Sequence, residues 1–422
     1  MQTSQDRRRF LQTLTKAGAA TLSTAFLPNP LHASGPAHLL EPADPAAGHI
    51  FLTQPYLQDP TPHAMTVMWI TNLPAYSWVE YEAATPGQAQ PTPDPKTPLA
   101  LKAHSVTDGI VDAYNRLNRI TLYDLQPGTT YRYRILSKEI AGFEPYQLTY
   151  GQTIQSELYS FTTPLESPTE MTCLILNDIH DRPASIPHLL DMNEQHPCDF
   201  VFLNGDMFDY QSDEQQIIDH LIHPCTQSFA SQTPFLYVRG NHETRGKYRS
   251  ELHHYFHNPG ARQYWSFTWG PVHFTVLDTG EDKPDDTPVY AGIVDFDAYR
   301  QEQLRWAEEV MKSKPFKTAA FRVVLMHIPP FYSGDWHGTM HCRTLFNPLF
   351  NKHKVDMCIS GHTHRYGVHA PVSGQHDYPI IIGGGPKEGE RTLIKVHADK
   401  KKLQLVMLDD NKKVVGNYEC RG

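Results

Sequence analysis

Side chains that can bind metal ions follow five apolar segments of this 422-residue chain. The segments read "MTCLIL", "FVFLNG", "FLYVRG", "FRVVLM" and "VDMCISG", and each has the apolar character of a strand buried in a sheet. The side chains that follow them, in chain order, are Asp178 and His180, Asp206 and Asp209, Asn241, His242 and Glu243, His327, and His362 and His364. Because ligands bind at the carboxyl ends of the strands in open α/β sheets, we expect these residues to converge on one site.

The chemistry of this set is that of a transition-metal site. Carboxylate, imidazole and amide oxygen together suit Zn, Mn or Fe better than Ca. No Cys-x-x-Cys pair occurs among the six cysteines, so a thiolate zinc site is not expected. One histidine after a strand is more often a structural residue, and one Asp-x-His is more often a turn. Five such groups in succession nevertheless indicate a shared metal site.

Two kinds of element would position these side chains. From about residue 49 to 163 the pattern is all-β, with short β-branched and aromatic segments at 65–70, 77–82, 118–123, 130–136 and 158–163. After a polar connector, apolar strands alternate with helical patterns such as "EQQIIDHLI" (214–222) and "YRQEQLRWAEEVMKS" (299–313). This alternation predicts an α/β layer architecture. The segment "LQPGTTYRYRI" (125–135) resembles fibronectin type III domains, in which Tyr131 would form the tyrosine corner of a β-sandwich.

The N-terminus is predicted to be a targeting segment. Residues 7–11, "RRRFL", fit a twin-arginine signal, and cleavage after Ala33 makes residues 1–33 the signal peptide. We therefore expect export by the twin-arginine machinery to a bacterial periplasm or beyond, with a disordered basic tail as the alternative. No membrane span is expected, because the apolar run is short and contains Lys16. The net charge of -9 argues against nucleic-acid binding as a main role.

The five groups together resemble the calcineurin-like metallophosphoesterases. The family pattern D-x-H, G-D-x-x-D, G-N-H-[DE], a lone H and G-H-x-H is found here as "DIH", "GDMFD", "GNHE", the histidine of "VVLMH", and "GHTH". The β-rich part (48–164) resembles the N-terminal domain of purple acid phosphatases, and 168–422 would be the phosphoesterase domain. The resemblance implies a β-sandwich flanked by helices in α/β/α layers, preceded by a small all-β sandwich like fibronectin type III.

The resemblance also implies residue roles. One metal ion would be held by Asp178, His180, Asp206 and His364, and the other by Asp206, Asn241, His327 and His362. Asp206 would bridge the two ions, and a hydroxide between them would attack phosphorus in line. His242 would donate a proton or hydrogen bond to the phosphate or the leaving oxygen. Glu243 is expected to orient that imidazole, and Asp209 to support the ligands.

Two positions depart from the purple acid phosphatases. That family has a tyrosine three residues after the bridging aspartate, where this chain has Asp209 and only then Tyr210. In the first block His180 stands where the family has a glycine that binds no metal. We therefore predict an enzyme that is not purple, with two ions drawn from Zn, Mn and Fe.

The residues around the metals are open to more than one reading. The segment "HIPPFYSGDWHGTMH" (327–341) is expected to be a loop over the crevice, with His337 and His341 as candidate substrate contacts. Arg245 could hold a phosphate oxygen or pair with a surface acid. The acidic segment "LDTGEDKPDD" (277–286) is predicted to be a solvated loop at the rim.

The sequence thus predicts a dinuclear metal-dependent hydrolase of a small phosphoester, with acid-phosphatase-like phosphomonoesterase activity as the leading function. One alternative is a phosphodiesterase that acts on a nucleotide or a lipid headgroup. The other is a binding protein that uses the same fold without catalysis.

Overall fold

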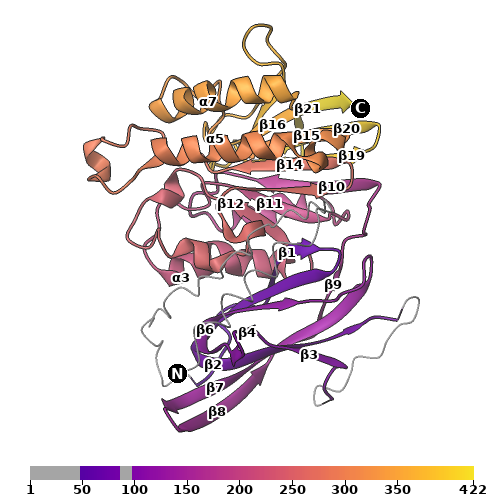
Figure 1. Cartoon of the computed structure of the whole chain (residues 1–422), viewed down its shortest axis with the longest axis vertical. Helices are drawn as coiled ribbons and strands as arrows, with labels where there is room; N and C mark the ends of the chain where they lie inside the picture. Colours follow the sequence, from indigo (N-terminus) through magenta and orange to yellow (C-terminus); the bar gives the residue numbers. More distant parts are fainter. Residues whose placement is uncertain (1–47, 86–96) are drawn as a thin grey trace, which may run out of the picture. The chain divides into compact units, whose positions relative to one another are not determined.

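The structure, a computed structural model, describes residues 48–85 and 97–422. The predicted signal peptide (1–33) lies outside the described residues. Among the described residues, no helix combines the length and the apolar character that crossing a membrane requires. Figure 1 traces the chain from the β-rich N-terminal part to the layered C-terminal part.

The N-terminal part is all-β, as predicted. Its strands are β1 (Tyr56–Thr61), β2 (Ala64–Ala83), β3 (Leu101–Ala103), β4 (Val106–Thr107), β5 (Ile110–Val111), β6 (Ala113–Leu122), β7 (Thr130–Glu144), β8 (Gln147–Gln155) and β9 (Tyr159–Thr162). The two strands expected at 65–70 and 77–82 are one strand, β2, of 20 residues. Its first half pairs with β1 and β6 and its second half with β3 and β7.

A register shift explains how the two halves of β2 can pair with different strands. The pairing of β2 with β6 shifts between Ile70 and Ala75, which bends the strand and increases its twist. Buried side chains from both halves, such as Trp69 and Val79, then meet Tyr133 in one core. The Tyr131 hydroxyl accepts the backbone N–H of Gln126 at 2.8 Å, which is the predicted tyrosine corner.

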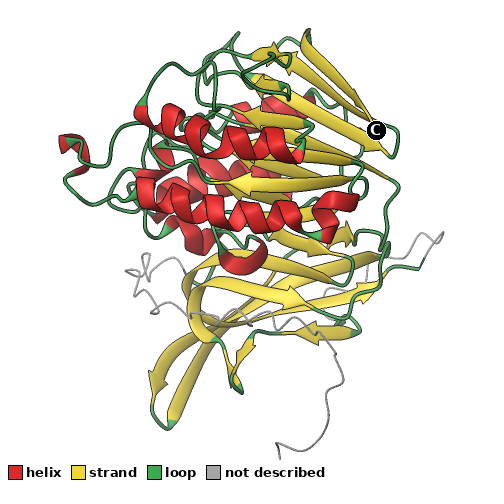
Figure 2. Cartoon of the chain, turned by 45° about the horizontal axis from the view of Figure 1, so that its top comes forward, coloured by secondary structure: helices red, strands yellow, loops and turns green. Residues whose placement is uncertain are grey.

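The C-terminal part contains two six-stranded sheets with helices beside them (Figure 2). The first has the order β12 (Phe235–Val238), β11 (Phe200–Asn204), β10 (Glu170–Leu176), β19 (Thr392–Asp399), β20 (Lys402–Asp409) and β21 (Val414–Arg421). The second has the order β13 (Trp265–Trp269), β14 (Val272–Leu277), β15 (Phe321–Met326), β16 (Met357–Ser360), β18 (Ile380–Ile382) and β17 (Gly367–His369). The β-sandwich flanked by helices is therefore confirmed.

Alternation along the strands explains the layers. On β10, Cys173 and Ile175 pack with Phe274 and Val323 of the second sheet, whereas Leu174 belongs to the core on the outer face. The strands read as continuous apolar runs because both faces are buried. The helices that cover the outer faces are α2 (Ser185–Asp191), α3 (Glu214–Ile217), α4 (His223–Cys225), α5 (Phe296–Lys312), α6 (Lys314–Thr318) and α7 (His337–His353).

The predicted helix at 299–313 is α5, and the one at 214–222 starts as α3. Asp213 caps α3 by accepting the N–H of Gln216, and the chain then continues through π-helical turns at Ile218–Ile222 and Thr226–Ala230. The expected loop over the crevice ends sooner than predicted, because α7 begins at His337. This helix buries Cys342, Phe346, Leu349 and Phe350 at helical spacing, although it contains Pro348.

One buried histidine in this fold is expected to make the protein sensitive to acid. His273 on β14 is 3% exposed, hydrogen-bonds through Nδ1 with Thr268 Oγ1 at 2.8 Å, and lies edge-on to Phe316. Burial lowers the pKa of His273 to about 4, and Arg322 adds to this effect. Since the unfolded chain binds this proton with the ordinary pKa of 6.5, the stability is complete above pH 6.5 and decreases as the pH falls towards 4.

We expect His273→Gln to remove this acid sensitivity. Between pH 7 and pH 5 the free energy of unfolding of the wild type should fall by about 2 kcal/mol more than that of the variant. Urea unfolding at the two pH values measures the difference. Equal decreases in both proteins would show that His273 is not the titrating group.

Candidate dinuclear metal centre

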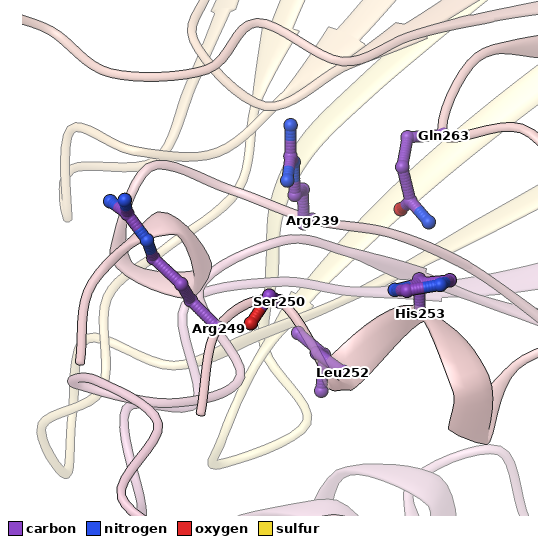
Figure 3. Close-up of a pocket in the computed structure, with 6 residues that line it drawn as sticks. All are labelled: Arg239, Arg249, Ser250, Leu252, His253 and Gln263. Carbon is purple, nitrogen blue, oxygen red and sulfur yellow. The ribbon is translucent and has the colours of Figure 1, made fainter. Parts of the chain in front are cut away.

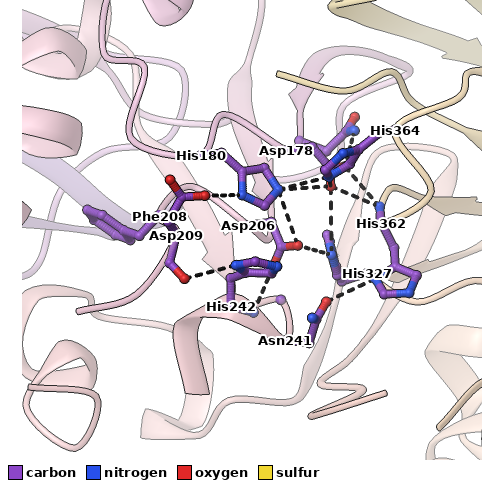
Figure 4. Close-up of polar contacts among 12 residues, drawn as sticks. Asp178, His180, Asp206, Phe208, Asp209, Asn241, His242, His327, His362 and His364 are labelled. Carbon is purple, nitrogen blue, oxygen red and sulfur yellow. Dashed lines mark hydrogen bonds and ion pairs between the residues drawn. The ribbon is translucent and has the colours of Figure 1, made fainter. Parts of the chain in front are cut away.

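The ends of five parallel strands bring the predicted ligands together. Three strands of the first sheet, β10, β11 and β12, and two of the second, β15 and β16, end at the same edge of the sandwich. The seven predicted ligands and His242 extend from these ends and face one another (Figure 4). They form overlapping groups whose ligand atoms lie within 4.8 Å of one another: Asp178 with His180 and His364, Asp206 with His327 and His362, and His180 with Asp206 and His242.

The distances are those of side chains that share cations. His180 Nε2 lies 3.0 Å from His364 Nε2, and Asp206 Oδ2 lies 3.0 Å from His327 Nε2. Asp206 Oδ2 is also 3.6 Å from His180 Nε2, so this one carboxylate reaches both groups. Asn241 Oδ1 lies 2.9 Å from His362 Nδ1. These side chains are therefore close enough to share ions, and their division into two ligand sets stays a prediction.

The donor set fits metal ions. His327 is fully buried, and its Nε2 has no hydrogen bond in the structure. Its other nitrogen, Nδ1, donates to the carbonyl of Asn204 at 2.8 Å, so Nε2 is the nitrogen that faces Asp206 Oδ2, 3.0 Å away. Burial lowers the pKa of His327, but Asp206 and Asp178 outweigh it and raise that pKa to about 10, so a bound cation would take the place of the proton on Nε2. Carboxylates, imidazoles and an amide oxygen are ligands for Zn, Mn or Fe.

The backbone at the strand ends is held in an uncommon conformation. Asp178, His180, Asp206, His362 and His364 all have φ between 49° and 74°, the left-handed region that costs a residue with a Cβ roughly 1–2 kcal/mol. Backbone bonds hold two of these turns: the N–H of Asp178 donates to the Gly205 carbonyl, and that of His180 to the Asp206 carbonyl, both at 3.0 Å. Strain of this kind concentrates at functional sites, where it aims side chains.

Burial and charge act against each other at the two central aspartates. Burial alone would raise the pKa of Asp178 and of Asp206, but nearby histidines, first His327, outweigh it and hold each pKa below its usual range. Burial lowers the pKa of His362 to about 4, and the charge of His327 lowers it further. The carboxylates and His362 are thus in the forms that bind metals, whereas His180 and His327, with pKa values raised to about 9 and about 10, would release a proton when a metal binds.

Asp209 positions two histidines at once. Its carboxylate accepts the N–H of His180 Nδ1 at 2.8 Å, and its backbone carbonyl accepts that of His242 Nδ1 at 2.9 Å. These bonds set the tautomers of both rings, so that each Nε2 is free to face the cluster. Asp209 thus supports a ligand without joining the metal groups. Tyr210, the next residue, is exposed.

Glu243 was predicted to orient the His242 ring, but it contacts backbone N–H groups instead. It is 0% exposed and accepts backbone N–H groups of Asp206 (2.9 Å), Met207 (2.6 Å) and Gly240 (2.7 Å). The carboxylate therefore fastens the turn that carries Asp206 to the end of β12. Gly240 is needed there, because a Cβ at this position would lie 2.2 Å from Asp206 Oδ1.

We expect Glu243→Gln to weaken metal binding by about 10- to 100-fold. Glutamine has nearly the same volume as glutamate, but its NH₂ group would face backbone N–H groups that donate to a carboxylate oxygen in the wild type. Competition with a chromophoric chelator measures the affinity, and the exposed Glu388→Gln is the matched control. Unchanged affinity in Glu243→Gln would mean that the turn holds its shape without this carboxylate.

Arg245 pairs with a buried acid and lies against His242. Its Nε and Nη2 bond the two oxygens of Glu281 at 2.9 and 3.0 Å, and Glu281 is 0% exposed. Its Nη1 lies 3.0 Å from His242 Nε2. The acidic segment 277–286 was predicted to be a solvated loop at the rim, and this prediction is wrong for two of its acids. Like Glu281, Asp278 is buried, and it accepts a hydrogen bond from Arg239 Nε at 2.6 Å.

His337 and His341 lie apart from the metal groups. Both are in the first turns of α7, on a helix rather than in the expected loop, and both imidazoles face Asp297 of α5. Their assignment to substrate binding stays a prediction. Asn177 was not predicted from the sequence; it donates to Asp178 Oδ2 at 2.6 Å and to the Gly384 carbonyl at 2.9 Å. Its position directly before the first aspartate was the available signal.

A separate pocket of about 200 Å³ is lined by Arg239, Arg249, Ser250, Leu252, His253 and Gln263 (Figure 3). None of the predicted metal ligands lines it. Arg239 is paired with Asp278, and Arg249 donates to the carbonyls of Thr244 and Ile293. The pocket is therefore distinct from the metal site, and both guanidinium groups that line it already have partners.

Comparisons with known proteins agree with this geometry. Residues 171–366 match the family model of the calcineurin-like phosphoesterases, and residues 52–163 match that of the purple acid phosphatase N-terminal domain. Acid phosphatase type 7 of Mus musculus is 25% identical over 350 residues, which are 76% of this chain and 70% of that protein. Purple acid phosphatase 22 of Arabidopsis thaliana is 26% identical over 65% of this chain and 60% of its own length.

The fold has a counterpart among solved structures. A purple acid phosphatase from yellow lupin (Lupinus luteus) seeds superposes with a TM-score of 0.64 at 17% identity, covering 86% of this chain and 73% of that one. The two family models together span most of the described residues, and the family motifs coincide with the cluster at the strand ends. The chain belongs to the calcineurin-like phosphoesterases, metal-dependent hydrolases of phosphoric esters, and carries a purple acid phosphatase N-terminal domain ahead of the hydrolase domain.

Proposed function

We propose that this protein is a dinuclear phosphomonoesterase that hydrolyses small phosphoesters by in-line displacement at phosphorus. The observation that carries the proposal is the pair of metal-binding groups connected by Asp206, with His242 beside them. Two ions held by these residues would polarise phosphoryl oxygens, acidify water and neutralise developing charge. Asp178, His180, Asp206 and His364 would hold one ion, and Asp206, Asn241, His327 and His362 the other.

The remaining residues bind and orient. His242 Nδ1 is occupied by the Asp209 carbonyl, so Nε2 is the atom available to a phosphate or leaving oxygen. Arg245 keeps Nη1 on the same side, while Glu281 fixes the other two nitrogens of its guanidinium. A phosphate oxygen held there would accept from His242 Nε2 when the imidazole is protonated, and from Arg245 Nη1 as a second donor.

This second donor supports a monoester over a diester. A phosphomonoester has three unesterified oxygens and a diester two, so an additional fixed N–H donor favours the monoester. Because Glu281 is buried, it holds the Arg245 guanidinium in one orientation before the substrate binds. The phosphodiesterase alternative requires that a second ester group fit where Arg245 and His242 meet.

Other features stay proposals of the same kind. The ions are drawn from Zn, Mn and Fe, and the enzyme is not purple, since Asp209 stands where a tyrosine would have to bind iron. Export by the twin-arginine machinery to the periplasm or beyond, through residues 1–33, rests on the "RRRFL" segment. The domain boundaries at 48–164 and 168–422 are likewise predictions.

The test is turnover of nitrophenyl phosphate against its bis-ester, on protein loaded in turn with Zn, Mn and Fe. We expect a preference for the monoester. A preference for the bis-ester would overturn the monoesterase assignment and favour a phosphodiesterase. Absence of turnover with both substrates, in protein that holds two ions, would favour the non-catalytic binding protein.

A further inference from the structure

A fourth group of metal-competent side chains among the described residues lies outside the dinuclear centre. Asp297 is in the first turn of α5, and His337 and His341 are one turn apart on α7, so both imidazoles are on the same face of that helix. Their ligand atoms lie within 4.8 Å of one another. Asp297 Oδ1 is 2.8 Å from His337 Nε2 and 2.9 Å from His341 Nδ1.

The contact with His341 is not a hydrogen bond. His341 Nδ1 is closed off from solvent and has no hydrogen-bond partner in the structure, although Asp297 Oδ1 is only 2.9 Å away. The direction of approach must therefore be wrong for an N–H donor, which leaves a buried ring nitrogen unsatisfied. A cation among the three side chains would use this nitrogen as a ligand. A tetrahedral zinc ion with bonds of about 2.0–2.1 Å needs ligand atoms about 3.3 Å apart, so a small outward shift would suffice.

The charges around the group allow a cation. Arg300, which is fully buried, donates Nη1 to Asp297 Oδ1 at 2.9 Å, so part of the carboxylate charge is already shared. Oδ2 is not shared with Arg300 and contacts His337 Nε2 at 2.9 Å. Burial lowers the pKa of His341, which favours the neutral imidazole that binds metals. Asp285, which accepts the backbone N–H of Asp297 at 2.8 Å, adds a further negative charge.

We propose that Asp297, His337 and His341 bind one zinc ion, separate from the dinuclear centre, with a fourth position open to water. The ion would tie the start of α5 to the start of α7. Two bonds extend from this junction to the segment that fixes Arg245: Gly338 N–H donates to the Asp282 carbonyl at 2.8 Å, and Arg300 Nη2 donates to the Glu281 carbonyl. By joining these elements, the ion would support the rim of the crevice.

Metal content tests the proposal without reference to turnover. The full chain is loaded with excess zinc, freed of loose ions by gel filtration, and analysed for zinc per chain by plasma mass spectrometry. We expect three ions in the wild type and two in each of His337→Ala, His341→Ala and Asp297→Asn. His353→Ala, on the same helix but outside the group, is the matched control and should retain three.

A second readout guards against misfolded variants. Zinc added to protein that already holds two ions should raise the melting temperature of the wild type and of His353→Ala, but not that of His337→Ala. The His337 side chain is partly exposed, so its removal is not expected to disturb the fold. Two ions in the wild type and no difference among the variants would overturn the third site and leave the proposed function intact. A third ion that the variants keep as well would be an adventitious ion only, and would also overturn it.

Discussion

Asp206→Asn is expected to lower kcat/KM at least about 10³-fold and to release at least one of the ions bound by the wild type. Asp206 is the side chain that reaches both metal groups, with Oδ2 3.0 Å from His327 Nε2 and 3.6 Å from His180 Nε2. Asparagine offers one neutral oxygen in place of a carboxylate, so it cannot bridge two cations. A bound metal contributes several kcal/mol to transition-state stabilisation, and each ~1.4 kcal/mol is a factor of ten in rate.

The variant is expected to keep the local turn, because one backbone contact of Asp206 survives the substitution. The amide oxygen of asparagine can still accept the His242 backbone N–H, which Asp206 Oδ1 accepts at 2.9 Å. Kinetics and metal content are measured together, with the exposed Asp191→Asn as the matched control. Full turnover with all ions retained in Asp206→Asn would rule out Asp206 as the bridging ligand.

The ligand positions could be predicted because they depend on local pattern. Apolar strands are recognisable in sequence, and the side chains after them must gather where parallel strands end. Asp178, Asp206 and His327 therefore lie together without any knowledge of the loops. Strand order alone predicts that these side chains gather, whereas the choice of seven of them as ligands came from the family resemblance and stays a prediction.

The surroundings of the metals could not be predicted, because they depend on partners distant in sequence. Glu281 and Asp278 look like surface acids in "LDTGEDKPDD", but they are buried against Arg245 and Arg239, each more than 30 residues away. Glu243 was assigned to its neighbour His242, whereas its partners are the backbone of Asp206 and Met207. Sequence spacing does not show which backbone donors a buried carboxylate will meet.

The start of α7 was not predicted from the sequence, because it also depends on tertiary contacts. The segment after His327 contains prolines, glycines and a serine, which favour a loop. The structure nevertheless starts α7 at His337, because tertiary burial of Cys342 and Phe346 outweighs weak local propensity. That start puts His337 and His341 on one helical face opposite Asp297, a placement that a loop would not specify.

His242→Ala is expected to reduce kcat by about 10²- to 10⁴-fold while the bound metal stays unchanged. His242 Nε2 faces the cluster because Nδ1 is bonded to the Asp209 carbonyl, and its ring lies 4.5 Å from that of His180. It is not one of the seven predicted ligands, so its loss should remove a hydrogen-bond or proton donor and leave the ions in place. The surface variant His223→Ala is the control.

The dependence on the leaving group separates two roles for His242. If it protonates the leaving oxygen, the loss in His242→Ala should be small for nitrophenyl phosphate, whose leaving group needs no proton, and much larger for an alkyl phosphate. If it only holds a phosphate oxygen beside Arg245, both substrates should lose the same factor, because the bond is then made to the group that is transferred. Loss of metal from the variant would instead assign His242 to the ligands, consistent with its position within 4.8 Å of His180 and Asp206 ligand atoms.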